Sequence, residues 1–390
     1  MIKIISTEKF TTNILCVLIR RPLNRAEVTG TALLPPLMAR GTAKYPTLRE
    51  IRLAAEAMQG SIFDAQIIKK GEQQILQFFL EFSGKNEMAA LDFLEEVILY
   101  PRFDTAHIEG EVENLKNRIE GRINDKSEYA KLKCFEIMCK DEPFGIYGDG
   151  YIEDLPGISP SEHYKKIMQN SPIDFFALGK WDAHWLESDI SSRFGKLDNR
   201  LKVLNGGAKK ARKKRQIIEI NQGFNQGNIC IGLRGNISPF GLDFIHLLLA
   251  NEILGSGPNA KLFTNIREKR SLCYSIFSTV YRFKSLMCIQ AGCEPHMMGE
   301  VLILAEQELK ELKSGKFSKE DFLTAKQSLA KQWRTLSDKP SACIDFAASQ
   351  YLIGDPNSTE DLLNLLDDAN ADGVQSIASL LDIDTVVMMQ

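Results

Sequence analysis

One stretch in the second half of the chain decides how the rest is interpreted: Leu254-Gly255-Ser256-Gly257-Pro258-Asn259-Ala260-Lys261-Leu262-Phe263, continued by Ile266-Arg267-Glu268-Lys269 and Leu272-Cys273-Tyr274. It begins at the end of a helical segment and leads into a strand-like one. Gly255-Ser256-Gly257 is half of a phosphate-binding loop, but the Gly-Lys pair is missing and a helix precedes it, so we reject that function.

The elements around this stretch occur twice in the chain. When the sequence is shifted by 214 positions, residues 16–63 overlay residues 230–277 without a gap, and nine of the 48 positions are identical. Chance would give about three identities at ordinary residue frequencies. The repeat predicts two related halves of similar construction.

Each half has the hydrophobic patterns of a sheet with helices packed on it. In the first half we expect strands at 14–20, 61–68 and 73–82, and helical stretches up to residue 40 and at 47–59, 86–99 and 105–123. In the second half we expect strands at 228–234, 273–280 and 286–293, and helical stretches at 240–254, 260–270, 297–314 and 318–335. The predicted fold is α+β, with two homologous domains that each contain a mostly antiparallel sheet.

The 390 residues exceed one ordinary core, so we expect domains at 1–194 and 217–390 with a linker at 195–216. The linker contains the basic run Lys209-Lys210-Ala211-Arg212-Lys213-Lys214-Arg215. Such a run can bind nucleic acid, but no aromatic residues interleave with it and the formal net charge of the chain is −3. We therefore favour a solvated linker and expect no nucleic-acid partner.

Composition points to a reduced, soluble protein. No apolar run reaches the roughly 20 residues of a membrane helix, and residues 1–9 do not have the pattern of a secretory signal. The eight cysteines form no Cys-x-x-Cys pair and lie mostly in apolar runs. We expect a cytoplasmic location and no membrane partner.

Histidine spacing excludes a zinc site built locally on one helix. The five histidines are more than 20 residues from one another: His107, His163, His184, His246 and His296. A zinc hydrolase needs several converging ligands, usually including His. The nucleophile motif Gly-x-Ser-x-Gly is also absent from the sequence.

The stretch from Leu254 to Tyr274 resembles the second-domain signature of the insulinase/pitrilysin-like zinc peptidases, a family that includes the mitochondrial processing peptidase and two-subunit bacterial enzymes. The resemblance implies metalloprotease-like domains of LuxS-like, ferredoxin-related layers. It also implies that Arg267 and Tyr274, seven residues apart, contact a substrate peptide. Arg267 offers a permanently charged fork, and the Tyr274 hydroxyl can hydrogen-bond a peptide or a developing oxyanion. The structural alternative is an Arg paired with a neighbouring acid and a half-buried Tyr.

The same family carries an inverted zinc motif, His-x-x-Glu-His, shortly before a Gly-Thr and a Tyr-Pro. That landmark is present here as Gly41-Thr42 and Tyr45-Pro46. Counted back from it, Ala32 replaces the first His, Pro35 the Glu and Pro36 the second His. These side chains cannot bind zinc or accept a proton. Two interior prolines also predict a kinked or shortened helix.

The family's third zinc ligand is a glutamate in a later helix of the first domain. By our alignment Arg118 occupies that position, where a cation would repel zinc. Glu111 and Glu120 are the alternative neighbours. A lone carboxylate would not restore the site.

The resemblance implies a subunit that works in a pair, in which one chain carries zinc and the other lacks it. We expect no catalytic residue and no metal in this chain, zinc in a homologous partner, and an unfolded or leader-type peptide as substrate. Such a peptide would pair with an exposed sheet edge. A homodimer is possible when the partner is absent. The second hypothesis is a structural or peptide-binding scaffold with no part in proteolysis.

Overall fold

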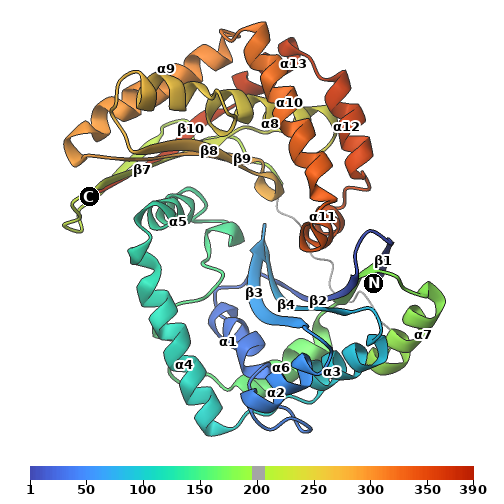
Figure 1. Ribbon diagram of the computed structural model, residues 1–390. Helices are drawn as coiled ribbons and strands as arrows, with labels where there is room; N and C mark the ends of the chain where they lie inside the picture. Colours follow the sequence, from blue (N-terminus) through green and yellow to red (C-terminus); the bar gives the residue numbers. More distant parts are fainter. Residues whose placement is uncertain (196–206) are drawn as a thin grey trace. The chain divides into compact units, whose positions relative to one another are not determined.

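A computed structural model describes residues 1–195 and 207–390 of the chain (Figure 1). These residues form two units by their internal contacts. The first contains Met1–Gly121, the described part of Ile146–Leu204, and Ser337–Leu352. The second contains Arg122–Gly145, the described part of Asn205–Leu336, and Ile353–Gln390. Half of the predicted linker, residues 196–206, lies outside the described residues.

The first unit is built on a five-stranded sheet of order β1-β5-β2-β4-β3. Its only parallel pair is β1 with β5, at one edge, and β3 forms the other edge. The strands are β1 (Ile2–Ser6), β2 (Thr12–Pro22), β3 (Ile62–Lys70), β4 (Gln73–Ser83) and β5 (Ile173–Gly179). In β2 the whole run from Ile14 to Ile19 is buried, because both faces of the sheet are covered.

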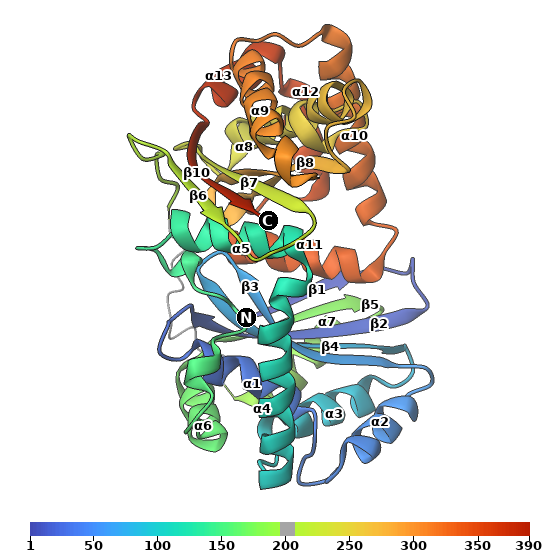
Figure 2. The same cartoon turned by 90° about the vertical axis from the view of Figure 1, so that its left-hand side faces the viewer.

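Helices cover this sheet and bury its core. They are α1 (Val28–Met38), α2 (Leu48–Glu56), α3 (Glu87–Leu99), α4 (Thr105–Glu120), α6 (Pro160–Asn170) and α7 (Ala183–Phe194). Thr47 and Glu50 form a capping box that starts α2. The helices α1 and α4 lie side by side, as Figure 2 shows, and bury Ala32, Leu37 and Leu115 between them. This packing holds the segment where the family's zinc motif would stand.

The second unit repeats the arrangement with a sheet of order β6-β10-β7-β9-β8. Its strands are β6 (Gln216–Ile220), β7 (Gly227–Arg234), β8 (Ser275–Tyr281), β9 (Leu286–Cys293) and β10 (Asp382–Met389). Its helices include α5 (Lys126–Met138), α8 (Gly241–Asn251), α9 (Met298–Lys313), α10 (Lys319–Leu336), α12 (Thr359–Asp368) and α13 (Ala371–Ser379). Two π-helical turns, η4 (Glu252–Ser256) and η5 (Phe263–Glu268), replace part of the predicted α-helix.

Short 3₁₀ helices complete the connections: η1 (Gly121–Asn124), η2 (Pro143–Gly145), η3 (Ile152–Asp154), η6 (Arg282–Lys284) and η7 (Pro295–Met297). The predicted α+β fold with two sheets is confirmed, and the expected strands and helices match observed elements within a few residues. Each sheet has one parallel pair, so it is mixed. The sequence patterns did not reveal the edge strands β1 and β6 or the closing strands β5 and β10.

The two units exchange a helix, so neither is a continuous segment of sequence. From the first half, α5 packs on the second sheet through Cys134, Phe135 and Met138, against Cys230 and Cys288. From the second half, α11 (Pro340–Ile353) belongs with the first sheet. The expected contiguous domains 1–194 and 217–390 therefore differ from the structural units by these two segments.

Matching ion pairs fix the exchanged helices. In the first unit, Arg20 Nε lies 2.5 Å from Asp174 Oδ2, and the Tyr351 hydroxyl of α11 donates to Asp174 Oδ1 at 3.1 Å. In the second unit, Arg234 Nη2 lies 2.6 Å from Glu142 Oε1, just beyond α5. Arg20 and Arg234 are an identical pair of the 214-residue shift. The repeat thus extends from the sheets to the groups that hold the exchanged helices.

Candidate functional site

The positions of the family's zinc motif lie in α1, on a helix that contains both prolines. Ala32 is fully buried, Pro35 is buried, and Pro36 is partly exposed. The helix runs two residues past Pro36, and Ala39 donates its N–H to Pro35 O at 3.2 Å. The prolines therefore do not end the helix, so the expectation of a helix shortened at this point is wrong. The tight packing of α1 against α4 offsets the two missing backbone donors.

A hollow of about 520 Å³ lies beside this end of α1. It is lined by Pro36, Ala39, Arg40, Leu48, Ile51, Arg52, Ala55, Glu56, Ser61, Ile62, Phe63, Asp64, Ala65 and Glu111. The lining thus combines α1 and α2 with the first residues of the edge strand β3 and one carboxylate from α4.

The carboxylate in this hollow is held by a guanidinium. Arg40 Nε donates to Glu111 Oε1, and Glu111 is buried. Arg118 lies further along α4, where it is exposed, and it does not line the hollow. The structure therefore puts Glu111, one of the two alternatives left open by the sequence, beside Pro36. In the sequence, the only signal for this ion pair was the position of Arg40 directly before the Gly41-Thr42 landmark.

The residues present here do not fit a zinc ion. Zinc needs three or more nitrogen, sulfur or oxygen donors, whereas Ala32, Pro35 and Pro36 offer no side-chain donor. The buried carboxylate of Glu111 is already paired with Arg40, and the other acids of the hollow, Glu56 and Asp64, do not form a metal-binding group with it. Across residues 1–195 and 207–390, no group of three or more His, Cys, Asp or Glu side chains is placed to hold a metal.

The edge strand β3 has one side free for pairing. It pairs with β4 alone among the described strands, and its residues alternate between exposed and partly exposed from Ile62 to Gln66. Ile62 is 59% exposed. Unpaired main-chain groups on such an edge are a template for an added strand. The hollow runs along the same residues.

Arg267 and Tyr274 lie at the start of the corresponding edge strand, β8. Arg267 belongs to η5 and is exposed, with its guanidinium 4.8 Å from the centre of the Phe263 ring. Tyr274 directly precedes β8, is 52% exposed, and donates its N–H to Gly292 O at 2.8 Å. No acid in the described residues forms an ion pair with Arg267. Of the structural alternative, the paired acid is absent among the described residues, whereas Tyr274 is about half-buried.

The charge of Arg267 acts on Cys273, the residue before Tyr274. Burial raises the pKa of the Cys273 thiol, and the positive charge of Arg267 opposes that shift. Arg267 therefore lies within electrostatic reach of the residue next to Tyr274. A π-helical turn places Arg267 there: Lys269 N–H donates to Thr264 O at 3.1 Å, five residues back. Such turns are common at functional sites, and the sequence pattern did not reveal this one.

The remaining titratable residues do not add to this site. All eight cysteines are free thiols, seven of them buried. Burial lowers the pKa of His163, whose Nε2 lies 2.8 Å from Thr31 Oγ1. His246 accepts from the Asn370 N–H at 3.4 Å. None of the described helices is long and apolar enough to cross a membrane.

Comparisons with known proteins agree with this geometry. A sequence model described as the inactive domain of peptidase M16 matches residues 161–329. The chain is 26% identical to the probable inactive metalloprotease YmfF of Bacillus subtilis (strain 168), over 99% of this chain and 95% of that protein.

Two solved structures have the same fold. A conserved protein from Enterococcus faecalis V583 has a TM-score of 0.91 at 22% identity, covering 100% of this chain and 96% of that one. A peptidase M16 inactive domain from Pseudomonas fluorescens has a TM-score of 0.86 at 17% identity, covering 100% and 95%. These matches show that the chain is similar to inactive members of the M16 peptidase family, and Ala32, Pro35 and Pro36 offer no zinc ligand.

Proposed function

We propose that this chain is the zinc-free subunit of a two-subunit peptidase and binds extended peptide for a zinc-bearing homologue. The observation that carries the proposal is the edge strand β3. Its free side runs along a hollow in which a proline and an Arg40–Glu111 ion pair stand where the family's metal chemistry would be. In this proposal the site can still bind a peptide but has no group that could cleave it.

Main-chain pairing would give the affinity. A peptide added to β3 places alternate side chains on the two faces of the sheet, and one set enters the hollow between Pro36 and Phe63. The hollow has apolar walls at Leu48, Ile51 and Ala55. Because only extended chains can pair in this way, the proposal favours unfolded or leader-type peptides over folded proteins.

Arg267 and Tyr274 would supply further peptide contacts. Arg267 has no acid partner among the described residues, so its guanidinium is available for a carbonyl or a carboxylate. The Tyr274 hydroxyl is exposed next to the edge strand β8 and can donate to a peptide carbonyl. In this proposal the zinc lies in the partner, the complex works in the cytoplasm, and the two halves of the chain arose by internal duplication.

The first experiment tests whether the chain is inactive alone. We expect the purified chain, supplied with zinc, to leave unfolded peptides intact, and a zinc-motif homologue to co-purify with it and bring chelator-sensitive cleavage. Hydrolysis by the chain alone that a chelator stops would falsify the proposal.

The second experiment tests the peptide contacts in the assembled pair. Arg267→Ala and Tyr274→Phe should each lower kcat/KM for peptide cleavage by about tenfold, the usual scale for a central contact residue. Arg270→Ala and Tyr100→Phe are matched controls, because both residues are exposed. Unchanged cleavage in the Arg267 and Tyr274 variants would favour the scaffold hypothesis instead.

A further inference from the structure

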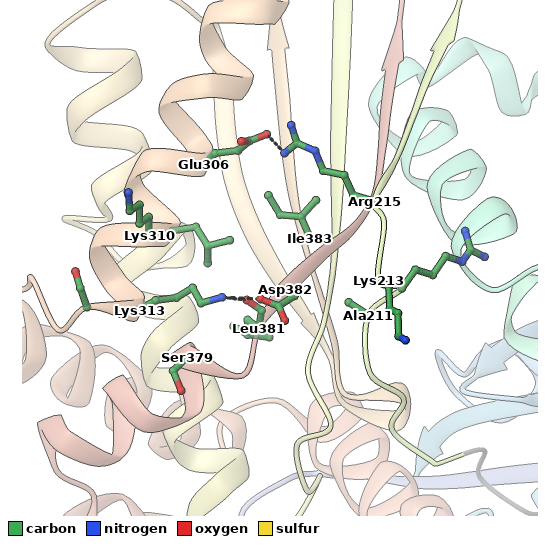
Figure 3. A pocket seen from close by; sticks show the side chains of 13 residues that line it. Ala211, Lys213, Arg215, Glu306, Lys310, Lys313, Ser379, Leu381, Asp382 and Ile383 are labelled. Atoms are coloured by element: carbon green, nitrogen blue, oxygen red, sulfur yellow. Dashed lines mark hydrogen bonds and ion pairs between the residues drawn. The ribbon is translucent and has the colours of Figure 1, made fainter.

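A second hollow, of about 810 Å³, lies in the second unit, on the helix-covered side of β10 (Figure 3). Three segments form its walls: residues 211–215 before β6, the C-terminal half of α9, and the residues around the start of β10. Its lining residues are Ala211, Arg212, Lys213, Arg215, Glu306, Leu309, Lys310, Lys313, Ser314, Ser379, Leu381, Asp382 and Ile383. It shares no residue with the hollow beside β3.

Its charge is strongly positive in a chain whose formal net charge is −3. Five basic and two acidic side chains line the hollow, and Arg212 pairs with Asp384 outside the lining, which leaves two positive charges in excess. Both acids are already used, as Figure 3 shows: Glu306 pairs with Arg215 at 2.5 Å, and Asp382 pairs with Lys313 at 2.7 Å. Lys213 and Lys310 are exposed and have no acid partner among the described residues.

The basic wall is anchored, so its position does not depend on a solvated linker. The Arg212 N–H donates to Asp384 Oδ2 at 2.9 Å, and Arg212 Nη2 donates to Ile137 O at 3.0 Å, at the end of α5. Arg215 reaches across to α9. Arg212 and Arg215 are thus held by polar contacts although both side chains stay partly exposed to solvent. The wall holds Lys213 at the rim.

The chemistry of the walls selects the class of ligand. The floor contains the buried residues Leu309 and Leu381 and the partly exposed Ile383, so an apolar group of a ligand can pack on Ile383. The hollow adjoins the C-terminus of α9, where the helix dipole is negative and opposes a compact multiply charged anion such as a phosphate group. Carboxylates spread along a peptide can pair with the long lysine side chains at the rim and stay away from the C-terminus of α9.

We propose that this hollow binds an acidic peptide segment in which aliphatic residues alternate with Asp or Glu. The aliphatic side chains pack on Ile383, and the carboxylates pair with Lys213 and Lys310. The site is separate from the edge-strand function proposed above, so either can fail alone. It gives the chain a way to hold an acidic stretch of a partner protein.

The test measures binding of a fluorescein-labelled hexapeptide of alternating Glu and Leu to the full chain by fluorescence anisotropy. The acidic peptide should bind, more weakly as NaCl rises, and the same peptide with Lys in place of Glu should not. The double variant Lys213→Glu/Lys310→Glu should weaken binding by about tenfold or more.

The matched control is Lys85→Glu/Lys165→Glu, which makes the same change of net charge at two exposed lysines outside the hollow. We expect the control to weaken binding by less than about twofold. Equal weakening by both double variants would mean bulk electrostatic attraction and would overturn the site. Tripolyphosphate that binds at this hollow more tightly than the peptide would overturn the choice of ligand.

Discussion

Arg40 and Glu111 carry the clearest consequence at the scale of single residues. Glu111 is buried, and its carboxylate is paired with Arg40. Because of this ion pair, Glu111 is not free to take part in metal binding.

Removing Arg40 should destabilise the fold. In Arg40→Met the buried carboxylate loses its partner, and we expect the free energy of unfolding to fall by about 2 kcal/mol, less than for a fully buried pair because Arg40 is about one-third exposed. Urea denaturation measures this change in the free energy of unfolding. Arg40→Met/Glu111→Gln should recover most of the loss. The control Arg118→Ala changes an exposed residue on the same helix as Glu111 and should change stability by less than about 0.5 kcal/mol. An equal effect of the two single variants would contradict the assignment.

Glu308 should give the chain a pH-dependent weakness. Burial raises the pKa of this carboxyl, while the hydrogen bond from Asn265 opposes the shift. A raised pKa in the folded state means that the folded chain binds more protons than the unfolded one. Stability is therefore lost as the pH rises from the unfolded pKa through the folded one.

Glu308→Gln should remove this loss. We expect the variant to gain stability relative to the natural chain at pH 8, on the order of 1 kcal/mol, and to gain less at pH 5. Thermal unfolding at the two pH values measures the difference. Glu300→Gln, on the same helix but exposed, should show no such pH dependence. A gain that is the same at both pH values would mean that the charge of Glu308 is not the cause.

At the scale of elements, α1 shows how packing can override a local preference. Pro35 and Pro36 disfavour a helix, yet α1 continues to Met38, because Leu33, Leu34 and Leu37 are fully buried around them. The sequence correctly located the helix. It could not show that the helix continues past the prolines, because the stabilising contacts come from α4, α6, β3 and β4.

Pro36→Ala should therefore stabilise the chain. The change restores a backbone donor inside a helix, and Pro36 is partly exposed, so little packing is lost. We expect a net gain of about 1–2 kcal/mol in urea denaturation, since the helix cost of proline exceeds its entropic benefit in the unfolded chain. Pro356→Ala, in an exposed loop, should give no gain. A loss in the Pro36 variant would show that the ring is needed for packing.

At the scale of the whole molecule, the exchange of α5 and α11 ties the two halves of the sequence into one folding problem. Without α5, the second sheet would expose Cys230, Cys288 and Val387, which it buries in the full chain. Without α11, Asp174 and Arg20 would lose the Tyr351 hydroxyl. The two exchanged helices begin 214 residues apart in the sequence. Because each unit contains a helix from the other half of the sequence, the dependence is mutual.

Separate halves should consequently fail to fold. We expect residues 1–195 and 207–390, expressed alone, to give aggregated or partly folded protein, and the two expressed together to form a complex of native secondary structure. Gel filtration and circular dichroism test this. A half that is monomeric and unfolds cooperatively by itself would contradict the prediction.

The sequence by itself determined the α+β class, the order of the central elements and the absence of any zinc-binding side chain at Ala32, Pro35 and Pro36. Those features depend on local periodicity and on residue identity at fixed spacing, which a sequence carries directly. Only the tertiary structure decided that Glu111 pairs with Arg40, that α5 and α11 change units, and that an anchored basic wall forms a hollow. An amphipathic helix face or a charged side chain does not specify its partner locally, because the partner is chosen by the packing of segments far apart in the chain.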